Sequence, residues 1–182
     1  MPRTSERVTT IHIGEMAVGS KPMAVRTVLG SCVSACLFDP VARVGGMNHF
    51  LLADFNPGSR TGSEARFGLH AMELLINGMM RLGAERTRIV AKAFGGANII
   101  PGMSSPTVGE RNVSFLESFL ALEKIRLASH YFGGDSAIQV VFHTHTGRAF
   151  MRSVGERALR ETILEESRAY RSRPATGDVT LF

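Results

Sequence analysis

The sequence predicts a mixed α/β sandwich, in which sheets of short strands pack together with two long helices. Short β-rich segments alternate irregularly with two amphipathic segments of helical periodicity, which is typical of this class. The chain has 182 residues, of which 44% are hydrophobic and 20% charged, as in a single globular domain with a buried core. No internal repeat points to a solenoid or a propeller.

Four β-like segments precede the first long helix. They combine β-branched and apolar residues and are separated by Gly, Ser and Pro. The predicted strands are Thr9–Ala17, Val25–Leu29, Cys32–Asp39 and Gly46–Ala53.

The first long helix is predicted from Ser63, as its N-cap, to about Leu82, and Gly83 ends it. Apolar residues recur at helical spacing and form the expected inner face. These residues are Phe67, Ala71, Leu74, Leu75 and Leu82.

The second half of the chain begins with a predicted strand, Arg88–Phe94, that runs into the tight turn GGAN at residues 95–98. A second helix is predicted over Gly109–Leu127, and Glu110 suits its first turn. Its expected inner residues are Val113, Leu116, Leu120 and Leu127. A turn at Tyr131–Asp135 and two closing strands, Ile138–Thr144 and Ala149–Val154, complete the predicted core.

Composition narrows the class of protein. Cys32 and Cys36 are too few for a disulfide scaffold or a four-cysteine zinc site. Met1–Ser20 lacks the apolar stretch of a signal peptide, and no segment is long and apolar enough to cross a membrane. We therefore expect a cytoplasmic protein with free thiols and no membrane insertion. The net charge of +5 comes from scattered arginines without an aromatic-basic motif, so we expect no nucleic-acid partner.

Cys32 and His49 form the most informative pair. The sequence Asp39-Pro40-Val41-Ala42 is typical of a type I turn, and if it closes a hairpin, residues whose numbers sum to 81 face each other. Cys32 then lies directly opposite His49. A thiol beside an imidazole can form a thiolate–imidazolium nucleophile, with the bend at Gly30-Ser31 aiming backbone N–H groups at an oxyanion.

The same two residues have a second interpretation, a small buried side chain packed against a core histidine, and their spacing alone leaves both open. Cys36 is expected to be structural, because no titratable side chain faces it in this hairpin. The pair His143 and His145 suggests a metal site, but no acidic or cysteine ligand accompanies it nearby in the sequence. We favour a polar surface strand there.

Four motifs, LGSCVSACLFDP, GGMNHFLL, KAFGGAN and GERNV, occur in order within about residues 10–155. They resemble the CheD family, the chemoreceptor glutamine deamidases of bacterial chemotaxis. The resemblance implies an α/β sandwich related to glutamine-deamidating toxins. It also implies catalysis by Cys32 and His49 with an assisting threonine, for which Thr27 is the nearby candidate.

The implied reaction converts a glutamine side chain of a methyl-accepting chemotaxis receptor to glutamate and needs no metal or organic cofactor. Backbone N–H groups of Ser31 and Cys32 are expected to hold the oxyanion. The alternatives are a regulatory module that binds a chemotaxis phosphatase with little or no catalysis, and another thiol acyl transfer. We expect a deamidase domain at residues 1–155 and a charged, solvated helical tail of unknown role at 156–182.

Overall fold

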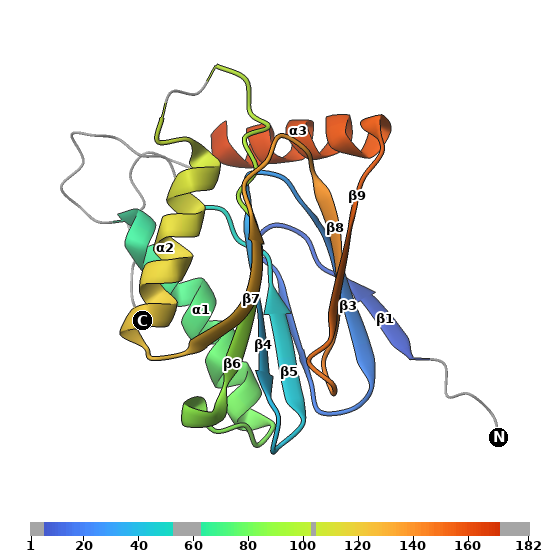
Figure 1. Cartoon of the computed structure of the whole chain (residues 1–182), viewed down its shortest axis with the longest axis vertical. Coiled ribbons are helices and arrows are strands. Elements are labelled where there is room, and N and C mark those ends of the chain that lie inside the picture. The colour runs from blue at the N-terminus through green and yellow to red at the C-terminus, as the bar shows by residue number, and fades with distance from the viewer. Residues whose placement is uncertain (1–5, 53–62, 103–104, 172–182) are drawn as a thin grey trace.

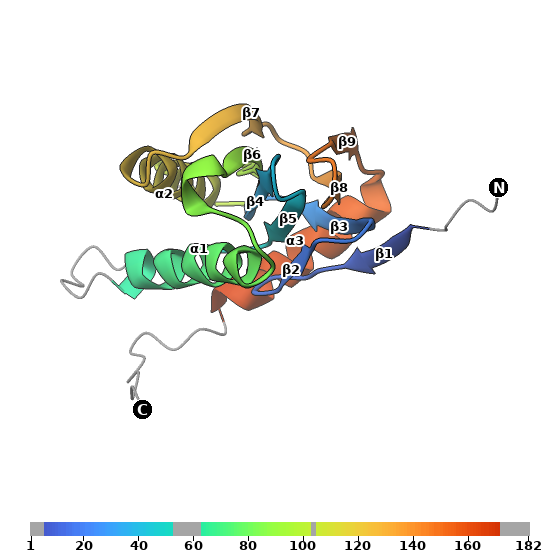
Figure 2. The ribbon, with the colours of Figure 1, turned by 90° about the horizontal axis from the view of Figure 1, so that it is seen from below.

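The structure, a computed structural model, describes residues 6–52, 63–102 and 105–171. It has three layers: two helices, a five-stranded sheet and a four-stranded sheet (Figures 1 and 2). The five-stranded sheet has the order β2 (Met16–Gly19), β5 (Val44–Asn48), β4 (Val33–Asp39), β6 (Val90–Gly95), β7 (Arg126–Phe132). The four-stranded sheet has the order β1 (Arg7–Thr10), β3 (Met23–Leu29), β8 (Ile138–His143), β9 (Ala149–Ser153).

The helices are α1 (Ser63–Arg81), α2 (Val108–Leu122) and α3 (Glu156–Arg171), with a short 3₁₀ helix, η1, at Arg86–Arg88. α1 and α2 cover the outer face of the five-stranded sheet, whereas α3 crosses one end of the sandwich (Figure 1). Among the described residues, no helix is long and apolar enough to span a membrane.

Two apolar cores result from the alternation of side chains along β4. Val33, Ala35 and Leu37 pack toward the helices, and Cys36 packs between the two sheets together with Cys32, which directly precedes the strand. Because β4 is buried on both faces, its sequence is a continuous run of small and apolar residues rather than an alternating one. The predicted mixed α/β sandwich is confirmed.

The predicted strand Thr9–Ala17 is wrong as one element. β1 ends at Thr10 and lies in the four-stranded sheet, whereas β2 begins at Met16 and lies in the five-stranded sheet. A turn between them places Gly14 at a φ of 86°, a conformation that glycine adopts without strain. The alternating pattern is therefore shared by two strands of different sheets.

The predicted second helix is too long at its C-terminal end. α2 stops at Leu122, and Lys124 takes a left-handed φ of 57°. The chain then forms β7, which contains Leu127 and extends through Phe132 into the predicted turn. Within the described ranges β7 pairs with β6 alone, and this edge position leaves it without the apolar pattern that predicts a strand.

The predicted inner face of the first helix is only partly right. Leu75 is buried, but Leu74 is 43% exposed and Leu82 is also exposed. The buried stripe contains Met72, Ile76 and Met79, which pack on the five-stranded sheet.

The predicted closing strands are confirmed as β8 and β9, and the strand after the first helix as β6.

Candidate active site

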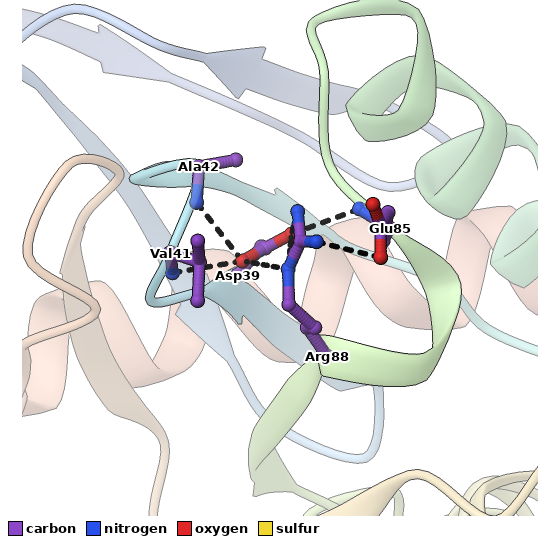
Figure 3. Close-up of polar contacts among 5 residues, drawn as sticks. All are labelled: Asp39, Val41, Ala42, Glu85 and Arg88. Carbon is purple, nitrogen blue, oxygen red and sulfur yellow. Dashed lines mark hydrogen bonds and ion pairs between the residues drawn. The ribbon is translucent and has the colours of Figure 1, made fainter.

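The turn between β4 and β5 differs from the predicted one. Asp39 accepts hydrogen bonds from the backbone N–H groups of Val41 and Ala42, but Arg43 adds a left-handed residue before the ladder begins (Figure 3). Asp39 pairs with Val44, so facing residues sum to 83 rather than to 81. The predicted register is therefore wrong, because the loop contains two more residues than a two-residue turn.

Cys32 and His49 nevertheless lie together. Val33 forms a bridge with Phe50, so Cys32 and His49 are diagonal neighbours across the ladder, and diagonal side chains on one face remain within reach. The Cys32 sulfur and a ring nitrogen of His49 are within 4.8 Å of each other. Both side chains are buried at the edge between the two sheets.

Thr27 determines the tautomer of His49. The Thr27 hydroxyl donates its hydrogen to the carbonyl oxygen of Ile11 at 2.7 Å. Since that hydrogen is committed, the hydroxyl oxygen accepts from Nδ1–H of His49, also at 2.7 Å. Nε2 then carries the free lone pair, and it is buried without a hydrogen-bond partner among the residues that the structure describes. The threonine suggested by the family resemblance is thus in contact with the histidine.

The histidine is neutral in this arrangement. Burial, with a smaller contribution from the charge of His12, lowers the pKa of His49 to about 3. The expected thiolate–imidazolium pair is therefore not the resting state here. A neutral imidazole with a free Nε2 can instead accept the thiol proton as Cys32 attacks.

Three consecutive backbone N–H groups next to the cysteine converge on one carboxylate. Gly30, Ser31 and Cys32 donate to Glu166 of α3 at 2.9, 2.7 and 3.2 Å, and the Ser31 hydroxyl adds a fourth bond at 2.6 Å. Successive N–H groups aimed at one point form an anion-binding nest. The predicted donors Ser31 and Cys32 both contribute to it, and Gly30 adds a third.

Neighbouring elements hold the Gly30–Cys32 loop in place. Asn112 of α2 donates to the carbonyl of Ser31 at 2.7 Å. Gly96 and Ala97 donate to the carbonyls of Cys32 and Gly30, each at 2.8 Å. Gly95 lies so close that a Cβ there would be 2.1 Å from the Cys32 carbonyl oxygen. The GGAN segment therefore lies directly against the site, but it is the end of β6 followed by irregular chain rather than the predicted tight turn, and Asn112 was not anticipated.

Two cavities flank His49. One of about 150 Å³ is lined by Thr27, His49 and the α3 residues Thr162 and Glu165. The other, of about 170 Å³, lies beside His70 of α1. Asn48 faces α1, as expected for the residue next to His49 on a strand: its side chain donates toward the carbonyl of Ala71.

Cys32, His49 and Glu166 are also the one group of metal-ligating residues that the described parts of the chain bring within 4.8 Å. Thiolate, imidazole and carboxylate are donors that suit zinc. Here, however, both carboxylate oxygens accept hydrogen bonds from the Gly30–Cys32 loop, which fits an anion in its nest better than a metal ligand.

The second histidine pair does have an acidic neighbour, contrary to the sequence-based expectation. Glu6, far away in the sequence, lies 2.8 Å from Nδ1 of His143 and 3.8 Å from Nδ1 of His145. β1 pairs with β3 and β3 with β8, and this arrangement brings the N-terminal segment to these histidines.

The fold and this site define a class: an α/β sandwich with a buried cysteine, a neutral histidine and a backbone anion nest, which together suit acyl transfer through a thiol. Comparison with known proteins then identifies the group. A family model described as CheD chemotactic sensory transduction matches residues 51–153. The chain belongs to the CheD family.

Named relatives support this assignment. A probable chemoreceptor glutamine deamidase CheD of Stenotrophomonas maltophilia strain K279a is 45% identical over 163 residues, which cover 87% of this chain and 81% of the relative. A protein of the same name from Caulobacter vibrioides strain NA1000 is 43% identical over 180 residues, 97% of this chain and 95% of the relative. The latter match extends into residues 156–182, beyond the segment that the four motifs span.

A solved structure, that of the hypothetical protein YfiH of Bacillus licheniformis, is more distant. Its TM-score is 0.40 at 13% identity, covering 71% of this chain and 61% of that protein. At this level of similarity it carries no functional information.

Proposed function

We propose that this protein is a protein-glutamine deamidase that converts glutamine side chains of chemoreceptors to glutamate. The observation that carries the proposal is the convergence of Cys32, a neutral His49 oriented by Thr27, and three N–H groups at one point. The names of the relatives supply the substrate class, since each is called a probable chemoreceptor glutamine deamidase.

The first half of the reaction forms a thioester. His49 Nε2 accepts the proton of the Cys32 thiol while the sulfur attacks the carboxamide carbon of the substrate. The carbonyl oxygen gains negative charge and takes the place in the nest where the N–H groups of Gly30, Ser31 and Cys32 converge. In other enzymes, losing one such donor costs about 10²–10³ in kcat.

The second half releases the products. The imidazolium of His49 returns its proton to the departing nitrogen, because an amide anion does not leave in water, and ammonia departs. Nε2 is then free to take a proton from a water molecule that attacks the thioester. Glutamate leaves, and the proton returns to the Cys32 sulfur.

The test is incubation of the full-length protein with a cytoplasmic fragment of a chemoreceptor, followed by peptide mass spectrometry. Deamidation adds about 1 Da at each modified glutamine and releases one ammonia. We expect His49→Ala to abolish both signals while the protein stays folded. A wild-type protein that binds the fragment or a chemotaxis phosphatase, but releases no ammonia, would favour the regulatory module instead.

A further inference from the structure

The helix that closes the site is unusual in what it buries. α3 lies across the end of the two sheets (Figure 1). Between Glu156 and Tyr170, its buried side chains are Thr162 and Glu166, which are both polar, whereas Leu164 is 56% exposed. A helix that docks for stability normally buries an apolar stripe. α3 half-buries apolar residues as well, and Ala169 and Tyr170 pack against the core between the sheets, but its two fully buried side chains are polar and one of them is a carboxylate.

The Glu166 carboxylate lies where the carboxylate product of the proposed deamidation would lie. Glu166 is 1% exposed, and its Oε1 and Oε2 accept all three N–H groups of the nest beside Cys32. Deamidation of a glutamine leaves the γ-carboxylate of a glutamate at this same place. Glu166 is chemically that product, held within the chain.

The closed helix also explains why the nucleophile is inaccessible. Cys32 is 0% exposed and His49 is 3% exposed. A substrate glutamine needs the nest that Glu166 occupies and the space beside Cys32. Two groups cannot share the nest, so α3 must move before a substrate enters.

Ion pairs on the exposed side of α3 would keep the segment helical after it detaches from the nest. Arg157 pairs with Glu161, and Arg160 with Glu156, both four residues apart and both exposed. Such pairs stabilise a helix locally. α3 also contacts the body of the protein through Ala169 and Tyr170, which pack against the core between the sheets, through the Tyr170 hydroxyl with Arg111 at 3.3 Å, and through Glu165 with His12 at 3.7 Å.

We infer that α3 is an inhibitory segment whose Glu166 occupies the active site as an internal product analogue, and that its release admits the substrate. This inference rests on the proposed deamidase function. It assigns a role to the charged C-terminal segment, for which sequence alone suggested only a solvated helix. The division of the chain at residue 155 stays a prediction.

The sharpest test turns the product analogue into a substrate. In Glu166→Gln, the amide replaces the carboxylate in the nest, and the protein is expected to deamidate its own residue 166. The Cys32 sulfur bonds to Cδ, ammonia leaves with a proton from His49, and water cleaves the thioester. The net change is one amide and one water converted to one carboxylic acid and one ammonia, and the peptide gains about 1 Da.

Two matched variants control this experiment. Cys32→Ala with Glu166→Gln must keep glutamine at 166, because it lacks the nucleophile. Glu161→Gln, at an exposed position of the same helix, must also keep its glutamine. Persistence of glutamine at 166 in a folded Glu166→Gln protein that deamidates a receptor fragment would overturn the inference while leaving the proposed function intact. Absence of both activities would instead count against the deamidase itself.

A second variant tests the closure without touching the nest. Thr162→Arg places a long charged side chain at the other buried position of α3 and should displace the helix. Since minor open states are commonly populated at about 0.1–10%, we expect iodoacetamide to label Cys32 about 10- to 1,000-fold faster than in the wild type. Receptor deamidation should also accelerate. Unchanged labelling and deamidation in a Thr162→Arg protein with a native-like circular dichroism spectrum would contradict an inhibitory role for α3.

Discussion

The hydroxyl of Thr27 accepts the Nδ1–H of His49 at 2.7 Å while it donates its own hydrogen to the carbonyl of Ile11. This pair of bonds leaves Nε2 of His49 as the basic nitrogen, in a ring that has a nitrogen within 4.8 Å of the sulfur of Cys32. Thr27 lies on β3 of one sheet, and His49 directly follows β5 of the other. The contact between the sheets therefore sets the protonation pattern of the site.

Replacing Thr27 by valine should lower kcat for deamidation, because Nδ1–H loses its acceptor and the imidazole can adopt the other tautomer. We expect a loss of about tenfold or more, a share of the roughly 10²–10⁴-fold that general-base catalysis contributes. Thr27→Ser keeps the hydroxyl and should restore most of the rate. Equal rates for the valine and serine variants would show that the hydrogen bond has no catalytic role.

The buried neutral state of His49 predicts a pH dependence of stability. The unfolded state binds a proton near pH 6.5, but the folded state does so only near pH 3, the lowered pKa of His49. Between these values the unfolded state holds more protons, so the free energy of unfolding falls as the pH falls, by at most about 1.4 kcal/mol per pH unit. Urea denaturation from pH 7 to pH 4 measures this slope. His49→Gln should flatten it, and an unchanged slope would locate the titration elsewhere.

The lowered pKa of Asp39 predicts a second pH dependence of the free energy of unfolding, at more acidic pH. Burial tends to raise its pKa, but hydrogen bonds from Arg88 and from the N–H groups of Glu85, Ala42 and Val41 outweigh burial and lower it (Figure 3). Because the pKa is lowered in the folded state, this stabilisation is complete above the unfolded value near 4 and is lost as the pH falls below it.

Asp39→Ala should therefore destabilise the fold at pH 7. The substitution leaves the backbone N–H groups of Val41, Ala42 and Glu85 without their acceptor, at a cost of about 2–3 kcal/mol in the free energy of unfolding. Asp135→Ala, at an exposed position, serves as the control and should change stability by less than about 0.5 kcal/mol. Similar effects for both variants would contradict a structural role for the Asp39 turn.

The two cysteines should differ in reactivity. Burial raises the pKa of Cys36 to about 12, so its thiol is inert at neutral pH. Cys32 lies at the site, under α3. Iodoacetamide at pH 7.5, followed by peptide mapping, should modify Cys32 before Cys36, with the largest difference in Thr162→Arg. Equal labelling of both cysteines in the folded protein would contradict this distinction.

The sequence predicted the fold class and brought Cys32 and His49 together as the proposed catalytic pair, but it placed them opposite each other through a register that the structure does not have. The two residues meet as diagonal neighbours because the loop between β4 and β5 is two residues longer than the predicted turn and includes Arg43 at a positive φ, which nothing in the local sequence specifies. Thr27 came from family resemblance, and the structure places it against His49.

Two residues that contribute to the candidate site could not be predicted from the sequence. Glu166 is one of several glutamates on an amphipathic, charged helix, and only its contact with a loop more than 130 residues away distinguishes it. Asn112 supports the carbonyl of Ser31 from the first turns of α2, where its sequence neighbours indicate only a helix start. Both act through long-range polar contacts, which leave no periodic pattern in the sequence.

The nucleophilic role of Cys32 is tested most directly by comparing Cys32→Ala with Cys36→Ala. Each variant removes one buried thiol close to the same β4 strand, so their effects on packing are matched. The measurement is the mass gain of about 1 Da per glutamine on a chemoreceptor cytoplasmic fragment, followed over time. We predict that Cys36→Ala retains deamidation and that Cys32→Ala abolishes it; deamidation by Cys32→Ala at the wild-type rate would contradict the account.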